Sequence, residues 1–395
     1  MAEYSPMMQH YLATKAEYKD CILFYRLGDF YEMFFDDALV VSKELELTLT
    51  GKDCGQEERA PMCGVPFHAA ETYINRLVSN GHKVAICEQM EDPKQAKGIV
   101  KREVIKVVTP GTNLNSQALD ETKNNYLMSI VYLGDVLGVA IADYSTGDFF
   151  VTEIETGAEL IDEINKFVPS EIILNEYFAM SGIDLTFISE KLSISVSTLE
   201  NWYFDDDSCK AKLKEHFHVN MLDGLGIKDY PVGIDAAGAL LIYLTQTQKS
   251  DMSHITSIVP YTTGKYMLID SSSRRNLELV ETMREKQKKG SLLWVLDKTK
   301  TAMGARALRN LVLQPLINRE EIIRQDAIEE LSDNAIDREE IREYLGPIYD
   351  LERIMTKISC KSANPRDLIA FKNSLEMIPH IKNQIGHFKC DVFRQ

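Results

Sequence analysis

The sequence lacks any long hydrophobic run. Its best candidate, residues 236–244, is half the length of the roughly 18 residues that a membrane-spanning helix needs, and polar residues flank it. The N-terminus also lacks the basic start and the apolar core of a secretory signal. We therefore expect a cytoplasmic protein with no membrane partner.

Cysteines are few and show no pairing pattern. The seven cysteines are an odd number, and no two of them have the CxxC spacing. This argues against both a disulfide framework and a zinc ribbon. A reducing compartment fits this usage best.

The common catalytic motifs are absent as well. The sequence contains no GxxxxGK[ST] phosphate-binding loop, no HExxH and no GxSxG. We therefore expect no catalytic residue, no cofactor and no metal in this chain. Two weak metal-site alternatives stay open: the pair His216 and His218, and a nuclease-like set of carboxylates, Asp135, Asp143 and Asp148.

Positive charge is scarce overall but locally concentrated. The 60 acidic and 44 basic residues give a net charge of −16, which argues against nucleic-acid binding over the whole surface but not at a local site. Residues 274–310 hold ten basic residues against four acids. Between residues 94 and 106 a single acid accompanies five basic residues: Lys94, Lys97, Lys101, Arg102 and Lys106.

The length and the pattern of elements predict a multidomain protein. At about 150 residues per domain, 395 residues make two or three domains. We expect a mixed α/β domain over residues 1–112, a polar linker over 113–125, an α/β domain over 126–250 and a mainly α region over 251–395. The last residues carry no helix cap or tail signal, so we expect the chain to be cut inside a longer protein.

Hydrophobic periodicity and turn residues locate the main elements. In the first domain we expect helices near residues 6–12, 36–45 and 68–77, and strands at 21–25, 83–87 and 103–108. The second should contain three antiparallel strands within 126–153, a helix at 158–167 and a strand at 171–174. Later helices are expected at 234–248, 292–313, 319–331, 338–345, 348–358 and 365–377.

Residues 27–35 are unusually aromatic, with four aromatic side chains within six residues beside a Gly-Asp turn. At strand spacing, Phe30, Glu32 and Phe34 share one face, and residues 31, 33 and 35 share the other. One interpretation is a core strand with an acid at its edge. The other is an apolar wedge that unstacks bases, next to a polar residue that contacts the bases exposed by the wedge.

Several segments in a fixed order resemble the MutS family of DNA mismatch repair proteins. They are GDFYEMF at 28–34, PMCGVPFHA at 61–69, VAICEQ at 84–89, VVTPGT at 107–112, RRNLEL at 274–279, MGAR at 303–306 with LQPL at 313–316, and PRDL at 365–368. Together they extend over nearly the whole chain. From the residues alone, Gly64 and Pro66 indicate a turn, His68 a packing or capping role, and residues 274–275 a helix cap or ion pairs.

The resemblance implies a fold and a function. It implies a mismatch-recognition domain, an RNase H-like connector domain, and a core and lever region that is cut before the clamp and ATPase domains. The function implied is the recognition of mismatched or unpaired bases in duplex DNA as the sensor of mismatch repair. The full-length protein would be an ATP- and Mg-dependent homodimeric clamp with a MutL-type partner, whereas this chain would not be an enzyme.

The resemblance also implies roles for single residues. Phe30 matches the family's wedge, which enters the minor groove, stacks on a mispaired base and kinks the duplex, and Glu32 matches the carboxylate that contacts the base. Since a carboxylate near phosphates is repelled by paired DNA, Glu32 would penalise matched duplex. Because the first domain would face DNA, the resemblance makes four basic residues candidate backbone contacts: Lys94, Lys97, Lys101 and Arg102. A metal-dependent nuclease and a protein-interaction scaffold remain as alternatives.

Overall fold

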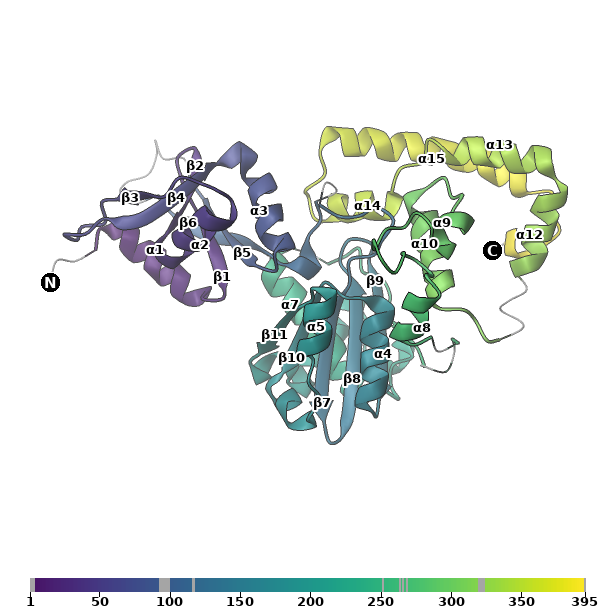
Figure 1. Ribbon diagram of the computed structural model, residues 1–395, viewed down its shortest axis with the longest axis horizontal. Coiled ribbons are helices and arrows are strands. Elements are labelled where there is room, and N and C mark those ends of the chain that lie inside the picture. Colours follow the sequence, from purple (N-terminus) through teal and green to yellow (C-terminus); the bar gives the residue numbers. More distant parts are fainter. Residues whose placement is uncertain are drawn as a thin grey trace.

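Figure 1 shows two α/β domains followed by a helical region in the computed structural model. The predicted fold class is confirmed at this level. The structure describes residues 4–91, 100–115, 118–250, 252–262, 264, 266–267, 269–318 and 324–393.

The first domain is a six-stranded sheet with helices on both faces. Its strands lie in the order β3, β4, β2, β1, β5, β6, with β1 and β5 parallel and the other neighbours antiparallel. Helix α1 covers one face, and α2 and α3 cover the other. The bounds are α1 Pro6–Glu17, β1 Cys21–Leu27, β2 Phe30–Phe34, α2 Phe35–Glu44, β3 Thr50–Lys52, β4 Ala60–Pro66, α3 Ala70–Ser79, β5 Lys83–Gln89 and β6 Arg102–Val108, with 3-10 turns at Phe67–Ala69 and Pro110–Thr112.

The second domain is also a six-stranded sheet between helical layers. Its order is β11, β10, β7, β8, β9, β12; β7, β8 and β9 form the predicted antiparallel meander, and β10, β11 and β12 pair in parallel with their neighbours. The bounds are β7 Leu127–Leu133, β8 Val136–Asp143, β9 Asp148–Ile154, α4 Gly157–Phe167, β10 Glu171–Asn175, α5 Thr186–Leu192, β11 Ser195–Leu199, α6 Asp206–Phe217, α7 Pro231–Gln248 and β12 Val259–Pro260, with 3-10 turns at Glu176–Ser181, Asn201–Phe204 and Leu222–Leu225.

Helix α7 explains the apolar run at 236–244. The helix is buried almost all round, between the sheet and α6, which is why it lacks a polar face. Gly238 permits the close contact with α6, because a Cβ at this position would lie 2.3 Å from the Cβ of Cys209.

The residues just after α7 pack with the second domain rather than the third. We predicted that the third region begins at residue 251. Val259 and Pro260 instead add β12 to the sheet beside β9, and Tyr261 joins the cluster under α4 and α5. Met252 and Ile255 join the cluster on the opposite face of the sheet.

The C-terminal region is helical, and its last part is an antiparallel arrangement in which α15 packs against α13 and α14 (Figure 1). The bounds are α8 Ser271–Asn276, α9 Leu292–Leu296, α10 Ala302–Leu313, α12 Arg324–Asp333, α13 Ala335–Leu345, α14 Leu351–Ser359, α15 Pro365–Ile385 and a 3-10 turn at Asp391–Phe393.

The prediction of one helix over residues 292–313 was wrong. The chain leaves the helix at Asp297, whose carboxylate accepts hydrogen bonds from the backbone N–H and hydroxyl of Thr299. A second helix then begins, with the Thr301 side chain accepting from the Gly304 N–H as an N-cap. Local side-chain bonding of this kind competes with the helical ladder and overrides the apolar spacing.

The polar segment after the first domain, which we predicted as a linker, is hydrogen-bonded to the helical region. Arg353 of α14 donates to the carbonyls of Asp120 and Lys123, and buried Arg306 of α10 donates to the carbonyl of Glu121. The segment therefore ties the helical region to the rest of the chain.

Candidate nucleic-acid interface

Strands β1 and β2 form a tight hairpin that ends in the predicted Gly-Asp turn. Leu27 pairs with Phe30, so Gly28 and Asp29 alone make the connection. Gly28 has φ +58°, a left-handed conformation that favours glycine. Phe30 is thus placed at the tip of the hairpin, directly after the turn.

Phe30 is exposed, unlike the strand that follows it. Its surface is 46% accessible, whereas Tyr31, Met33 and Phe34 are buried. Phe34 packs edge-on against Tyr11 of α1, at 4.9 Å between ring centroids, so the helix covers this end of the face and leaves the tip open. The core-strand interpretation therefore applies to Phe34 but not to Phe30.

The predicted strand ends one residue early. Phe35 was expected to share a face with Tyr31 and Met33, but it starts α2 with φ +53°. Its ring lies on the other side of the sheet, against Tyr4 and Tyr11.

Glu32 lies on the same face as Phe30 and is paired. Its Oε2 atom lies 2.5 Å from the Nζ atom of Lys52, on β3. The carboxylate side chain is largely buried and that of the lysine is partly exposed. The strand between them contributes Gly64 opposite Glu32, where an added Cβ would lie 3.5 Å from the Glu32 Cγ.

The interpretation of Gly64 and Pro66 as turn residues was wrong. Both lie in β4, where Gly64 pairs with Glu32 and Pro66 with Phe30. Gly64 allows β4 to lie close to β2, because an added Cβ would lie 3.3 Å from the carbonyl oxygen of Tyr31. Pro66 ends β4 just before the 3-10 turn.

A second aromatic group flanks the hairpin tip. Phe67 is 45% exposed and lies under the guanidinium of Arg26, 3.9 Å from its ring centroid. Arg26 also approaches Glu88, which accepts a hydrogen bond of 2.6 Å from the Tyr31 hydroxyl. Burial, and then this hydrogen bond, raise the pKa of Tyr31. His68 is exposed and makes no cap, but its ring meets that of Phe67 edge-on at 5.8 Å between ring centroids. Of the packing and capping roles expected for it, the structure shows only a packing contact.

The basic candidates differ in what they can reach. Lys94 and Lys97 lie outside the described residues. Lys101 is exposed and pairs with Glu103 at 2.7 Å, and this bond raises the pKa of the lysine. Arg102 is buried, and its guanidinium donates to the carbonyls of Arg26 and Val100 at 2.8 Å. It therefore fastens β6 to β1 and does not face solvent as a phosphate contact would.

The carboxylates of the nuclease-like alternative do not converge. Asp135 lies in the β7–β8 turn, whereas Asp143 and Asp148 pair at the opposite end of β8. Asp143 accepts from the backbone of Asn125 and Asp148 from the Thr146 hydroxyl, and burial raises the pKa of Asp148. Among the described residues, no three His, Cys, Asp or Glu side chains group closely enough to hold a metal ion.

The two histidines of the other metal-site alternative have different structural roles. His216 donates from Nε2 to the Ile255 carbonyl at 2.8 Å. His218 ends α6 as a left-handed cap residue.

Sequence reasoning missed Lys52, Arg26 and Phe67. Lys52 is twenty residues from Glu32 along the chain and two strands away in the sheet. Only the pairing of β4 between them brings the two together, so no local pattern could have indicated it.

Comparison with known families covers nearly all of the chain. The model described as MutS domain I matches residues 5–117, that for MutS domain II residues 125–256, and that for MutS domain III residues 272–395. This chain belongs to the MutS family.

Its relatives are named as DNA mismatch repair proteins. A DNA mismatch repair protein MutS of Lachnoclostridium phytofermentans is 66% identical over 396 residues, which are 100% of this chain and 42% of that protein. The MutS of Ruminiclostridium cellulolyticum is 54% identical, and the match covers 100% of this chain and 45% of that protein. The MutS of Acetivibrio thermocellus is 52% identical, and the match covers 99% of this chain and 45% of that protein. The chain thus spans less than half the length of these relatives.

MutS domain I, which carries the hairpin, is fastened to MutS domain II by a buried carboxylate. Glu171 of β10 is fully buried and accepts hydrogen bonds from the hydroxyls of Tyr243 and Thr109 and from the Gly111 N–H, at 2.6, 2.5 and 3.1 Å. Lys83 of β5 lies 3.8 Å away. The strand next to β1 is therefore linked directly to the second domain.

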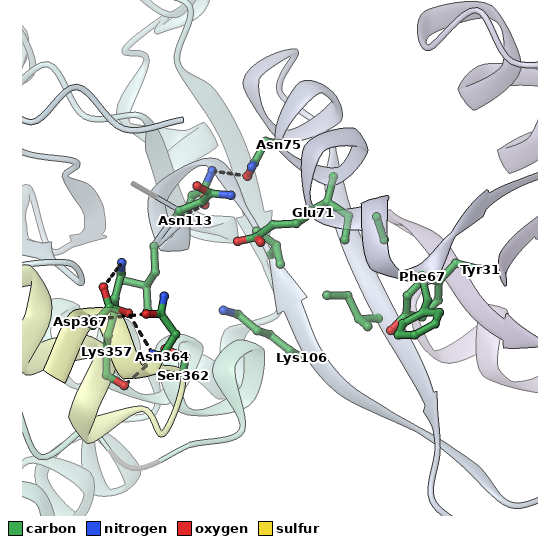
Figure 2. Close-up of a pocket in the computed structure, with 16 residues that line it drawn as sticks. Tyr31, Phe67, Glu71, Asn75, Lys106, Asn113, Lys357, Ser362, Asn364 and Asp367 are labelled. Carbon is green, nitrogen blue, oxygen red and sulfur yellow. Dashed lines mark hydrogen bonds and ion pairs between the residues drawn. The ribbon is translucent and has the colours of Figure 1, made fainter. Parts of the chain in front are cut away.

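MutS domain I faces the third region across a polar cavity of about 620 Å³. Figure 2 shows Glu71 and Lys106 of the first domain pointing toward it, and Lys357, Asn364 and Asp367 on the far side. Lys357 and Asp367 pair at 3.4 Å, while burial lowers the pKa of Lys106. A cavity therefore separates this part of MutS domain I from α14 and α15.

Among the residues that the structure describes, every helix is too short or too polar to span a membrane.

Proposed function

We propose that this chain is the mismatch-sensing part of a MutS protein, which recognises mismatched or unpaired bases in duplex DNA. The observation that carries the proposal is the exposed Phe30 at the tip of a hairpin whose other apolar side chains pack in the two hydrophobic clusters of the domain. Membership of the MutS family supports it.

In the proposed mechanism, Phe30 enters the minor groove, stacks on a mispaired base and kinks the duplex. Stacking a ring on a base contributes roughly 1–3 kcal/mol and tolerates any base identity, which suits a sensor of many mismatches. A mismatch also lowers the cost of unstacking and bending, so the kinked complex favours such sites. The rigid attachment of Phe30 to a packed sheet lets it act as a wedge.

We further propose that the second domain is an RNase H-like connector. The order β11, β10, β7, β8, β9, with three antiparallel strands followed by two parallel ones, supports this topology. The helical region would be the core and lever. The full-length protein would also contain a domain that binds ATP and Mg. It would act in the cytoplasm as a homodimeric clamp and engage a MutL-type partner. This chain alone would not be an enzyme.

Glu32 gives the first test of this interface. Glu32→Ala should tighten binding to matched duplex by about 2- to 5-fold, because it removes a negative charge near phosphates and leaves Lys52 free to attract them. Binding to mismatched duplex should change less, or fall, because a base contact is lost. Titration of both duplexes at one salt concentration measures this.

The control is Asp36→Ala, which removes an exposed acid from α2 of the same domain. It should leave both affinities unchanged. An unchanged matched-duplex affinity in Glu32→Ala would reject the repulsive role.

Lys101 tests the proposed backbone contacts, a group that also includes Lys94 and Lys97 but no longer the buried Arg102. Lys101→Glu should weaken binding to matched and mismatched duplex equally and reduce the slope of log affinity against log salt by about 1–2. Lys191→Glu, an exposed site on α5, is the matched control. A loss confined to mismatched duplex would show that Lys101 is no simple phosphate contact.

A further inference from the structure

We infer that Lys52 is a positioning residue for Glu32: it holds one carboxylate oxygen, leaves the other for the base, and neutralises the charge that the carboxylate presents to DNA. The inference rests on the proposed function, because it concerns the specificity of the same site. Its basis is the ion pair across β4.

The pair is built into the sheet. Lys52 lies on the edge strand β3, and its ammonium crosses β4 to reach Oε2 of Glu32 at 2.5 Å. Gly64 presents no side chain opposite Glu32, so nothing stands between the two partners. The ammonium also lies 5.8 Å from the ring centroid of buried Phe34, which restricts where it can go.

The two oxygens of the Glu32 carboxylate differ in their hydrogen-bonding partners. A carboxylate has two oxygens and can accept several hydrogen bonds. Oε2 is held by Lys52, and the structure shows no hydrogen bond to Oε1 among the described residues. Oε1 is therefore free to accept a hydrogen bond from a displaced base beside Phe30.

The charge balance follows from the same bond. An unpaired carboxylate would repel every duplex, including the mismatched one that the protein must retain. With Lys52 in place the pair carries no net charge, so the carboxylate discriminates through its hydrogen bond with less loss of overall affinity. Without Lys52, the carboxylate would repel both duplexes more strongly. It would also be less fixed, so the mismatched duplex would in addition lose its hydrogen bond, and the preference for it should fall.

A double-mutant cycle separates this role from a direct phosphate contact. Lys52→Met keeps the aliphatic stem and removes the charge, Lys52→Arg keeps the charge, and Glu32→Gln removes the acid. Each is made alone, and Lys52→Met is also combined with Glu32→Gln, in the full-length protein. Affinities for one mismatched and one matched duplex are measured at fixed salt, with Lys43→Met on α2 as the control.

We expect Lys52→Met to lower the preference for mismatched duplex roughly five-fold, the upper range for a partly exposed ion pair. In the Glu32→Gln background the same change should have less than about two-fold effect, and Lys52→Arg should retain the preference. An equal loss in both backgrounds, or no loss in either, would overturn the inference. Failure of the proposed function is distinct: the unmodified protein would then show no mismatch preference at all.

Discussion

Replacing Phe30 with alanine should abolish the preference for mismatched duplex and leave the domain folded. The ring is nearly half exposed at the hairpin tip, so little core packing is lost. Loss of one stacked ring should weaken mismatched binding by about 1–3 kcal/mol, with little change for matched duplex. Titrations of both duplexes and a thermal melt of the variant measure the two parts of this result.

Phe187→Ala is the matched control, because Phe187 is 75% exposed but lies on α5 of the second domain. It should leave mismatch preference intact. A Phe30→Ala variant that melts without cooperativity would show that the ring belongs to the core, and one that keeps its preference would show that it is not the wedge.

Replacing Glu171 with alanine should loosen the attachment of the first domain to the second. The change removes one of the two carboxylates near buried Lys83, the other being Asp20 at 3.4 Å. It also leaves the hydroxyl of Tyr243 without its acceptor and that of Thr109 with only Thr112 as a partner. Leaving a buried hydrogen-bonding group without its partner costs about 1–3 kcal/mol. Urea unfolding should therefore begin at a lower concentration than in the unmodified protein.

Glu190→Ala, an exposed acid on α5, is the control and should leave the unfolding midpoint unchanged. Unfolding should be followed by two probes, since a multidomain chain need not unfold in one step. If Glu171→Ala unfolds like this control, the buried cluster does not hold the two domains together.

Local patterns predicted much of the fold because local chemistry determines it. The Gly-Asp turn fixed the register of the hairpin, so the alternation that places Phe30 and Glu32 on one face followed from the sequence. Helices such as α4 and α15 have caps and apolar spacing that the sequence displays. Composition alone left residues 27–35 open to two interpretations, a core strand and a wedge. The segments that resemble the family then gave the candidate roles of Phe30 and Glu32.

What the sequence could not predict depends on contacts between distant segments. Pairing of β3 with β4 and of β4 with β2 brings Lys52 to Glu32, and it also turns a supposed loop around Gly64 into a strand. Arg102 counts as a basic residue in the sequence, but in the structure its guanidinium donates hydrogen bonds to two backbone carbonyls inside the domain. Burial of this kind is a property of the packed sheet and has no local signature.

The most direct test of the central claim is a paired titration of the full-length protein. One duplex carries a single mismatch or one unpaired base, and the other is the same sequence fully paired, both at one stated salt concentration. The proposed sensor predicts tighter binding to the mismatched duplex by roughly 5- to 150-fold, the range that corresponds to 1–3 kcal/mol. Equal affinities for the two duplexes would contradict it.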